Sequence, residues 1–210
     1  RIIVMAQDAP TLLEDPSLAW TKGDARIIAR VSGRTISGSV LAAVEDPAVG
    51  LPVLVTTADN VMLTPATVTE FVTGAGAGAG DVSVAFVERG NLERAVGPNR
   101  RTWLTFRDGA FTGANLFALT GPGSFHALRF WEKVEADRKS VLRLAAHFGP
   151  VLMVRLLLRR MDLRAALAAA GAKLGASVSP VVLSDGRMGV DVDKPEDHAL
   201  AERLLRDGRA

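Results

Sequence analysis

Two aspartates, each at the carboxyl end of a predicted strand, are the residues best suited to bind a metal ion. Asp59 follows the apolar run of Val53–Ala58, and Asp193 follows Met188–Val192. Ligands of open α/β sheets gather beyond the carboxyl ends of the strands. Mg²⁺ takes one or two carboxylates together with substrate phosphates. The pair therefore predicts a Mg²⁺ site for a nucleotide, with Asp59 and Asp193 as metal ligands.

A structural alternative is that both aspartates cap helices. Each precedes a predicted helix that carries proline near its first turn, Pro65 or Pro195. Asp at an N-cap position stabilises a helix by roughly 1 kcal/mol. The sequence leaves both interpretations open.

Composition limits the classes of protein that fit. With 210 residues, of which 48% are hydrophobic, the chain predicts one globular domain over residues 1–210. It contains no cysteine, which excludes disulfides, thiol nucleophiles and cysteine-based zinc sites. No apolar run reaches the roughly 18–20 residues that a membrane-spanning helix requires, and no secretory leader pattern is present. We therefore expect a cytoplasmic protein.

The charge pattern argues against a nucleic-acid partner. The net charge is only +2, the basic residues are dispersed and aromatic residues make up 5% of the chain, whereas a nucleic-acid surface needs a dense basic stripe with exposed aromatics. One segment, Val151–Arg160, is apolar with basic residues between its apolar ones. Such a helix either packs on the protein itself or makes peripheral contact with a membrane surface.

The elements that must position the two aspartates alternate along the first half of the chain. Strands are predicted over 1–5, which we expect to be buried, and over 27–31, 53–57 and 81–87. Helices are predicted over 37–45 and 64–73. This alternation predicts a mostly parallel sheet. The glycine-rich run 74–80 follows a helix and precedes a strand, the reverse of a dinucleotide phosphate loop, so we interpret it as a flexible connector.

The second half predicts two hairpins around a helical insertion. Asp108-Gly109 joins predicted strands 102–106 and 110–119. In the second strand, Gly113-Ala114-Asn115 marks either a bulge or a close approach of backbone to a ligand. Residues 122–176 are predicted to be a helical insertion, with breaks at Ser140 and at Gly149-Pro150. A second hairpin is expected from 177–183 and 188–192, before a closing helix over 195–206.

Three segments resemble one family. Thr57-Ala-Asp59, followed by Leu63-Thr-Pro65, resembles the central motif of nucleotidyltransferases of the nucleotide-diphospho-sugar transferase (GT-A-like) fold. Asp191-Val-Asp193-Lys-Pro-Glu-Asp197 resembles their Asp-x-Asp-Thr-Pro-Glu-Asp signature, with Lys194 where Thr is common. The segment 100–117 resembles the acceptor-side strands of the MobA-like NTP transferases, the subgroup most similar to this chain.

The resemblance implies an α/β fold with three layers, α/β/α, around a mostly parallel, mixed sheet. It implies a Mg²⁺-dependent enzyme that transfers NMP from an NTP, CTP or GTP, to a phosphorylated small-molecule acceptor and releases pyrophosphate. Asp59 and Asp193 would hold Mg²⁺. The nucleotide would contact Ser37, Ser39, Thr57, Ala58 and Asp59. The acceptor would contact Gly113 and Asn115, with Arg100, Arg101, Arg138 and Lys139 as candidate phosphate clamps or as solvated surface charges.

One departure from the family keeps other functions open. The family's glycine-rich triphosphate loop has no match, and residue 1 aligns with the family's second strand. A glycosyltransferase of the same fold is one alternative, although Thr57-Ala-Asp59-Asn60 lacks the second carboxylate of the usual Asp-x-Asp. The other alternative is a non-catalytic nucleotide-binding or membrane-associated module.

Overall fold

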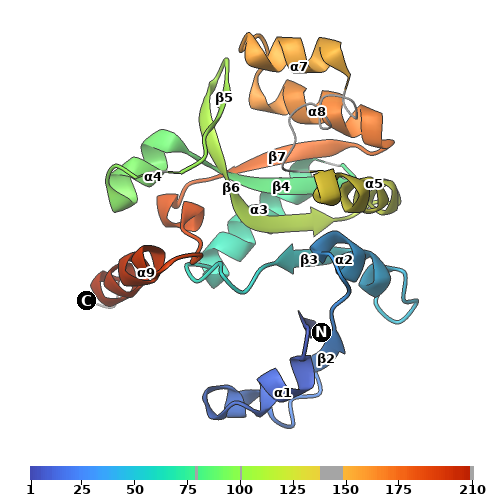
Figure 1. Ribbon diagram of the computed structural model, residues 1–210, viewed down its shortest axis with the longest axis vertical. Coiled ribbons are helices and arrows are strands. Elements are labelled where there is room, and N and C mark those ends of the chain that lie inside the picture. The colour runs from blue at the N-terminus through green and yellow to red at the C-terminus, as the bar shows by residue number, and fades with distance from the viewer. Residues whose placement is uncertain (79, 100, 138–148, 209–210) are drawn as a thin grey trace.

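The main sheet of the protein is mixed. A computed structural model describes residues 1–78, 80–99, 101–137 and 149–208. The strand order is β3 (Val53–Thr56), β6 (Gly109–Leu119), β4 (Val82–Glu88) and β7 (Val178–Leu183), with β5 (Leu104–Phe106) beside β6 (Figure 1). Strands β3, β4 and β7 run in one direction, and β6 lies antiparallel between β3 and β4. The short strand β5 extends one end of β6.

The first two strands form a separate parallel pair. β1 (Ile2–Ala6) and β2 (Ile27–Val31) are joined through α1 (Ala9–Glu14) and the 3-10 helix η1 (Pro16–Thr21). This pair lies away from the main sheet (Figure 1). The prediction that the first strand is buried is wrong, since Ile2 is 55% exposed. Among the described residues, β1 pairs with β2 alone, so its other edge is left without a covering strand.

Helices cover both faces of the main sheet, because the side chains of its strands alternate between two cores. On one face, α3 (Pro65–Gly78) and α9 (Pro195–Asp207) pack against strand residues that include Val181 and Leu183. On the other face, α2 (Ile36–Val44) and α5 (Gly123–Asp137) pack around Val82 and Leu119. Helix α8 (Leu163–Leu174) lies on this second face as well. The described elements therefore form three layers.

The glycine-rich run is helical over most of its length, so its interpretation as a flexible connector is wrong. Residues 74–78 are the last turn and a half of α3. A Cβ at Gly74 would lie 2.7 Å from Val181 Cγ1, and one at Gly78 would lie 2.9 Å from Ser179 Oγ. The glycines let the helix backbone approach β7 closely. This packing outweighs the low helix propensity of glycine.

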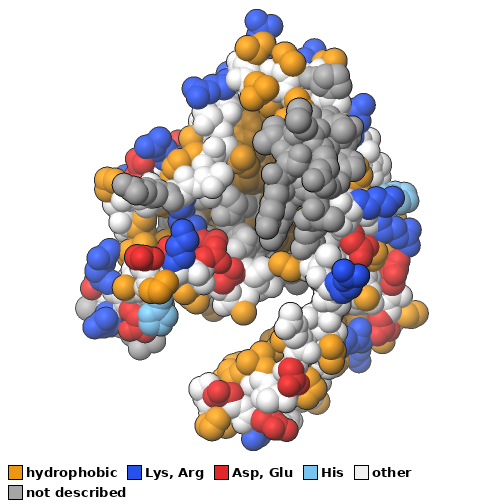
Figure 2. Space-filling view, in the orientation of Figure 1, with side chains coloured by type: hydrophobic (Ala, Val, Ile, Leu, Met, Phe, Trp, Pro, Cys, Tyr) orange, Lys and Arg blue, Asp and Glu red, His pale blue; other side chains and the backbone are white. Residues whose placement is uncertain are grey.

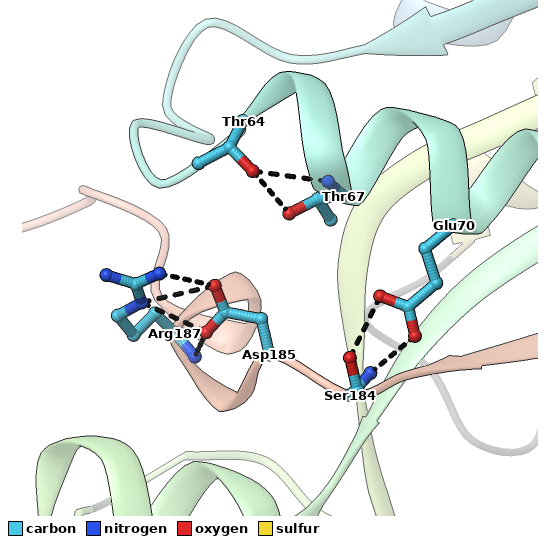
Figure 3. Close-up of polar contacts among 6 residues, drawn as sticks. All are labelled: Thr64, Thr67, Glu70, Ser184, Asp185 and Arg187. Carbon is cyan, nitrogen blue, oxygen red and sulfur yellow. Dashed lines mark hydrogen bonds and ion pairs between the residues drawn. The ribbon is translucent and has the colours of Figure 1, made fainter.

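The first predicted hairpin is confirmed and the second is wrong. Strands β5 and β6 pair antiparallel across the turn at Arg107-Asp108. After β7, by contrast, the chain enters the 3-10 helix η2 (Gly186–Gly189). Two polar contacts turn it there: Glu70 Oε1 accepts from Ser184 N–H at 2.9 Å, and Asp185 Oδ1 accepts from Arg187 N–H at 2.9 Å (Figure 3). β7 pairs instead with β4, in parallel.

The segment predicted as a helical insertion is helical over much of its described length. It contains α5, α7 (Pro150–Leu157) and α8. Asp162 Oδ1 accepts from Ala165 N–H at 2.7 Å and begins α8, which ends at Gly175 with a φ of +68°. The predicted break at Ser140 lies outside the described residues. Helix α4 (Arg89–Val96), after β4, was not predicted from the sequence. None of the helices in the described ranges combines the length and hydropathy needed to cross a bilayer.

Candidate functional site

The two aspartate segments, far apart in the sequence, lie side by side in the fold. The N–H of Val192 donates to the backbone carbonyl of Asp59 at 3.2 Å. Asp59 follows the carboxyl end of β3, and Asp193 directly follows the residue that makes this bond. The contact brings the two motifs to one edge of the sheet, where open α/β sheets bind ligands.

The helices that follow the two aspartates are capped by other residues. Thr64 Oγ1 accepts from Thr67 N–H at 3.2 Å at the start of α3 (Figure 3). At the start of α9, Asp197 Oδ2 accepts from Lys194 N–H at 3.1 Å and from Asp193 N–H at 3.3 Å. The interpretation of Asp59 and Asp193 as helix caps is therefore wrong. Neither carboxylate caps a helix, so both are available to bind a ligand.

The two carboxylates differ in their surroundings. The Asp59 side chain is half-buried and accepts a short hydrogen bond from Thr57 Oγ1, which orients it. Ala58, between them, is exposed. Asp193 is also exposed, and within the described ranges its carboxylate accepts no hydrogen bond. One held and one free carboxylate are hard oxygen donors of the kind that Mg²⁺ binds.

A buried asparagine connects the Asp59 loop to β6. Asn60 Nδ2 donates to the carbonyl of Ala114 at 3.0 Å and to Thr56 Oγ1 at 3.2 Å. The register between β4 and β6 shifts at this point, from Val84 opposite Phe117 to Phe86 opposite Gly113. β6 therefore bulges at the Asp59 loop. Asn60 is not among the residues predicted from the sequence; its position, directly after the strand-end aspartate, was the available signal.

The bulge places Gly113 and Asn115 beside the Asp59 loop. Asn115 has a φ of +47°, a left-handed conformation that is uncommon for residues other than glycine. Its half-buried side chain forms no hydrogen bond to any described residue. Gly113 is exposed, and a Cβ there would meet no atom within 4 Å. The interpretation of this segment as a bulge is confirmed, and close approach of its backbone to a ligand stays a prediction. Contact with an acceptor stays a prediction.

Arg101 is held by the second aspartate motif. It forms a short ion pair with the Asp191 carboxylate and donates to the Asp191 carbonyl at 3.3 Å. The arginine therefore fixes the segment that leads to Asp193, and its role as a phosphate clamp stays a prediction. Arg100, Arg138 and Lys139, the other predicted clamps, lie outside the described residues. Nearby, Arg89 stacks over Trp103, with its guanidinium carbon 5.6 Å from the ring centroid.

Both serines of the predicted nucleotide contact are buried at the start of α2. Ser39 Oγ donates to the carbonyl of Thr35 at 2.7 Å and accepts from Gly33 N–H at 2.8 Å. This hydroxyl thereby holds the turn before the helix. Ser37 is buried beside it. Contact of either serine with a nucleotide stays a prediction.

A second group of polar side chains lies at the carboxyl end of β7, and its members form hydrogen bonds and ion pairs with one another (Figure 3). Glu70 binds both the backbone N–H and the hydroxyl of Ser184. Arg187 donates to Asp185 and holds the pKa of that carboxyl below its ordinary value. These contacts explain the turn after β7, and neither Asp59 nor Asp193 takes part in them.

The carboxylates of Asp59 and Asp193 fit a cation whose remaining ligands come from a substrate. The described residues contain no group of three or more Asp, Glu, His or Cys that would hold a metal without help. Mg²⁺ needs no such group, because it is bound through one or two carboxylates plus substrate phosphates. Asp59 and Asp193 meet that requirement, because both are carboxylates and the segments that carry them are hydrogen-bonded to each other.

Comparison with known proteins relates the chain to a transferase. A solved structure of a hypothetical transferase from Thermus thermophilus matches it with a TM-score of 0.73 and 29% sequence identity. The match covers 84% of this chain and 76% of that one. No protein-family profile matches the sequence, and no curated protein does either. The similarity supports a transferase at the level of fold and general reaction class.

Proposed function

We propose that this protein is a Mg²⁺-dependent nucleotidyltransferase that transfers NMP from CTP or GTP to a phosphorylated small-molecule acceptor. The observation that carries the proposal is the bond between Val192 N–H and the Asp59 carbonyl, which joins the two aspartate segments. The similarity to a transferase structure supports it. So does the resemblance of both motifs to the MobA-like NTP transferases of the nucleotide-diphospho-sugar transferase fold.

Asp59 and Asp193 are the residues that would hold the metal. When bound, Mg²⁺ supplies neutralisation of charge on the triphosphate. Thr57 holds one oxygen of Asp59, and Asn60 fixes the loop to β6. Arg101 holds Asp191, so the backbone on both sides of the proposed site is fixed before a ligand binds. Such preorganisation is the main contribution of a protein to transfer at phosphorus.

The reaction needs no nucleophile from the protein. An oxygen of the acceptor phosphate attacks the α-phosphorus of the NTP, and a new P–O bond forms there. The bond from the α-phosphorus to the oxygen that bridges to the β-phosphorus breaks, and pyrophosphate leaves with its electron pair. Gly113 and Asn115, beside the Asp59 loop, are the residues we assign to the acceptor.

Thermal unfolding with each of CTP, GTP, ATP and UTP, with and without Mg²⁺, tests the proposal. A ligand at about 100 times its Kd stabilises a protein by roughly 2.7 kcal/mol, which raises the Tm of a chain of this size by about 5–10 °C. We expect a Mg²⁺-dependent shift with CTP or GTP, and its loss in Asp59→Asn and Asp193→Asn. Asp207→Asn, an exposed carboxylate on α9, is the matched control and keeps the shift.

Turnover provides the second measurement. With the acceptor present, each aspartate variant should release pyrophosphate about 100-fold more slowly or worse, while its Tm without ligand stays unchanged. The proposal is contradicted if the protein binds no nucleotide, or if both variants keep full activity. A shift with UDP- or GDP-sugars and no pyrophosphate release indicates the glycosyltransferase. Nucleotide binding that is independent of Mg²⁺ indicates a non-catalytic module.

A further inference from the structure

Helix α7 exposes apolar side chains on the face that points away from the protein. Its inner side packs through Leu152, which is buried next to α8. Val151, Val154 and Leu158 follow the i, i+3, i+7 spacing that puts them on one stripe. Their exposed fractions are 69%, 52% and 56%, and that of Leu157 beside them is 75%. Helix α7 is therefore apolar on two sides, and the described part of the chain covers only one of them.

Basic side chains are frequent in α7 and in the segment that follows it, including α8. Five cationic residues lie between residues 149 and 175, and all five are exposed. In the described part of the chain none of them forms an ion pair. The single carboxylate of the same segment, Asp162, is paired with Arg107 at 2.7 Å. Figure 2 shows apolar and basic side chains together at the end of the molecule that α7 forms. The five are Arg155, Arg159, Arg160, Arg164 and Lys173.

An apolar hollow opens beside the same helix. It has a volume of about 300 Å³ and lies between α7 and α8, lined by Val151, Leu152, Met161 and Ala169. The basic side chains of Arg155 and Lys173 also line it. Apolar walls next to cations match the two parts of an anionic lipid, an acyl chain and a negatively charged headgroup.

We propose that the α7 surface, formed by Val151, Val154, Leu157 and Leu158 with the five basic residues, docks on an anionic lipid bilayer. A basic amphipathic helix with an apolar face binds membranes in this way, lying in the plane of the interface. A second copy of the chain fits the surface less well. In a twofold dimer the same patch faces itself, so unpaired cations would face unpaired cations, and like charges in an interface repel.

Vesicle flotation with the full chain tests the proposal. Vesicles of phosphatidylcholine with phosphatidylglycerol should carry the protein, and vesicles of phosphatidylcholine alone should not. Each basic residue near an anionic surface contributes about fivefold in binding. We therefore expect Arg155→Gln/Arg159→Gly/Arg160→Gln to bind about 100-fold more weakly. Arg159 has a φ of +51°, so glycine removes its charge at a position where glycine relieves backbone strain.

Matched variants separate charge from apolar contact. Lys22→Gln/Arg34→Gln/Arg203→Gln removes the same charge from exposed positions outside the α7 surface and should bind as the wild type does. Val154→Ser/Leu157→Ser keeps every charge and should weaken binding, because both side chains are exposed and would contact the lipid. The Tm of each variant, which should be unchanged, shows that the fold is intact.

Three outcomes would overturn the proposal. The first is no binding to the anionic vesicles, and the second is equal binding to both kinds of vesicle. The third is a dimer in sedimentation velocity that Leu157→Ser converts to monomer, which would make the α7 surface a subunit interface. Weaker binding at high salt is a further expected result, since the Debye length falls to about 3 Å at 1 M.

Discussion

Asn115 combines local backbone strain with a place in the candidate site. Its left-handed φ of +47° is imposed by the bulge of β6 beside the Asp59 loop. Asparagine tolerates this conformation better than most residues, and glycine accepts it without strain. A side chain kept in a strained position, with no hydrogen bond to the described residues, is a candidate for ligand contact.

The first residue-scale prediction compares two variants at this position. Asn115→Gly should leave the free energy of unfolding unchanged or raise it by up to about 1 kcal/mol. Asn115→Val should lower it by about 1–3 kcal/mol, because a β-branched residue is strained at positive φ. Urea denaturation measures both. If Asn115 contacts the acceptor, the glycine variant is stable yet slow in turnover. A glycine variant that is unstable but fully active would contradict the assignment.

Asp81 gives a residue-scale prediction about pH. Its carboxylate accepts from the Ser177 hydroxyl at 2.6 Å, from Ser177 N–H at 2.8 Å and from Gly123 N–H at 2.9 Å. These bonds, led by that of the Ser177 hydroxyl, hold the pKa of Asp81 below its ordinary value. A depressed pKa stabilises the fold above the ordinary value of about 4. The stabilisation is lost as the pH falls from there through the pKa of the folded state.

We therefore expect Asp81→Asn to lower the free energy of unfolding by about 1–2 kcal/mol at pH 7, an amount reduced by the partial exposure of the site. The difference from the wild type should shrink below about pH 4, as measured by urea denaturation across the pH range. Ser177→Ala should show the same trend with a smaller amplitude. A difference that stays constant with pH would show that the charge of Asp81 contributes nothing.

At the scale of elements, helix α3 shows how packing overrides propensity. Its last five residues alternate glycine with alanine, and glycine is unfavourable in a helix unless close packing compensates for its low propensity. The packing is against β7, and this contact is possible because Gly74 and Gly78 have no side chains. Gly76, on the same helix, faces open space.

This difference predicts opposite effects of one substitution on one helix. Gly74→Ala puts a methyl group 2.7 Å from Val181 Cγ1 and should lower the free energy of unfolding by about 1–3 kcal/mol. Gly76→Ala meets no atom within 4 Å and should raise it by about 0.5–1 kcal/mol. Denaturant unfolding measures both, and each variant is the control for the other. Equal effects would mean that α3 does not pack on β7 as described.

At the scale of the whole molecule, the N-terminal strand pair is only loosely attached. Its contacts with the rest of the chain include the ion pair of Arg30 with Asp46 and a hydrogen bond from Arg1 Nη1 to the carbonyl of Ala48 at 3.1 Å. Ile2 and Val31 are exposed. By contrast, Ala85 and Val87 of β4 are fully buried in the larger core.

Hydrogen exchange should therefore differ between the two sheets. The amides of β1 and β2 should exchange more than about 100-fold faster than those of β4, because local opening there exposes little apolar surface. Exchange followed by mass spectrometry measures this over peptides 1–31 and 82–88. Equal protection in both would show that the strand pair unfolds only together with the main sheet.

The sequence by itself determined the structural features that depend on residues close together in the chain. The bounds of β2 and the presence of the β5–β6 hairpin follow from apolar patterns and turn residues. The start of α3 at Thr64-Pro65 and both ends of α8 follow from capping chemistry. The two aspartate motifs were visible for the same reason, since each is a short pattern at the end of a strand.

Only the tertiary structure decided the features that depend on a distant partner. β7 pairs with β4 instead of forming a hairpin, and the glycine-rich run is helical because β7 lies beside it. Asn60 reaches Ala114 and Arg101 reaches Asp191, which no local pattern reveals. The outer face of α7 is exposed because no described element covers it. Local propensity and capping set where many elements begin, but the end of α3, burial and strand pairing are settled by contacts between segments that the sequence keeps far apart.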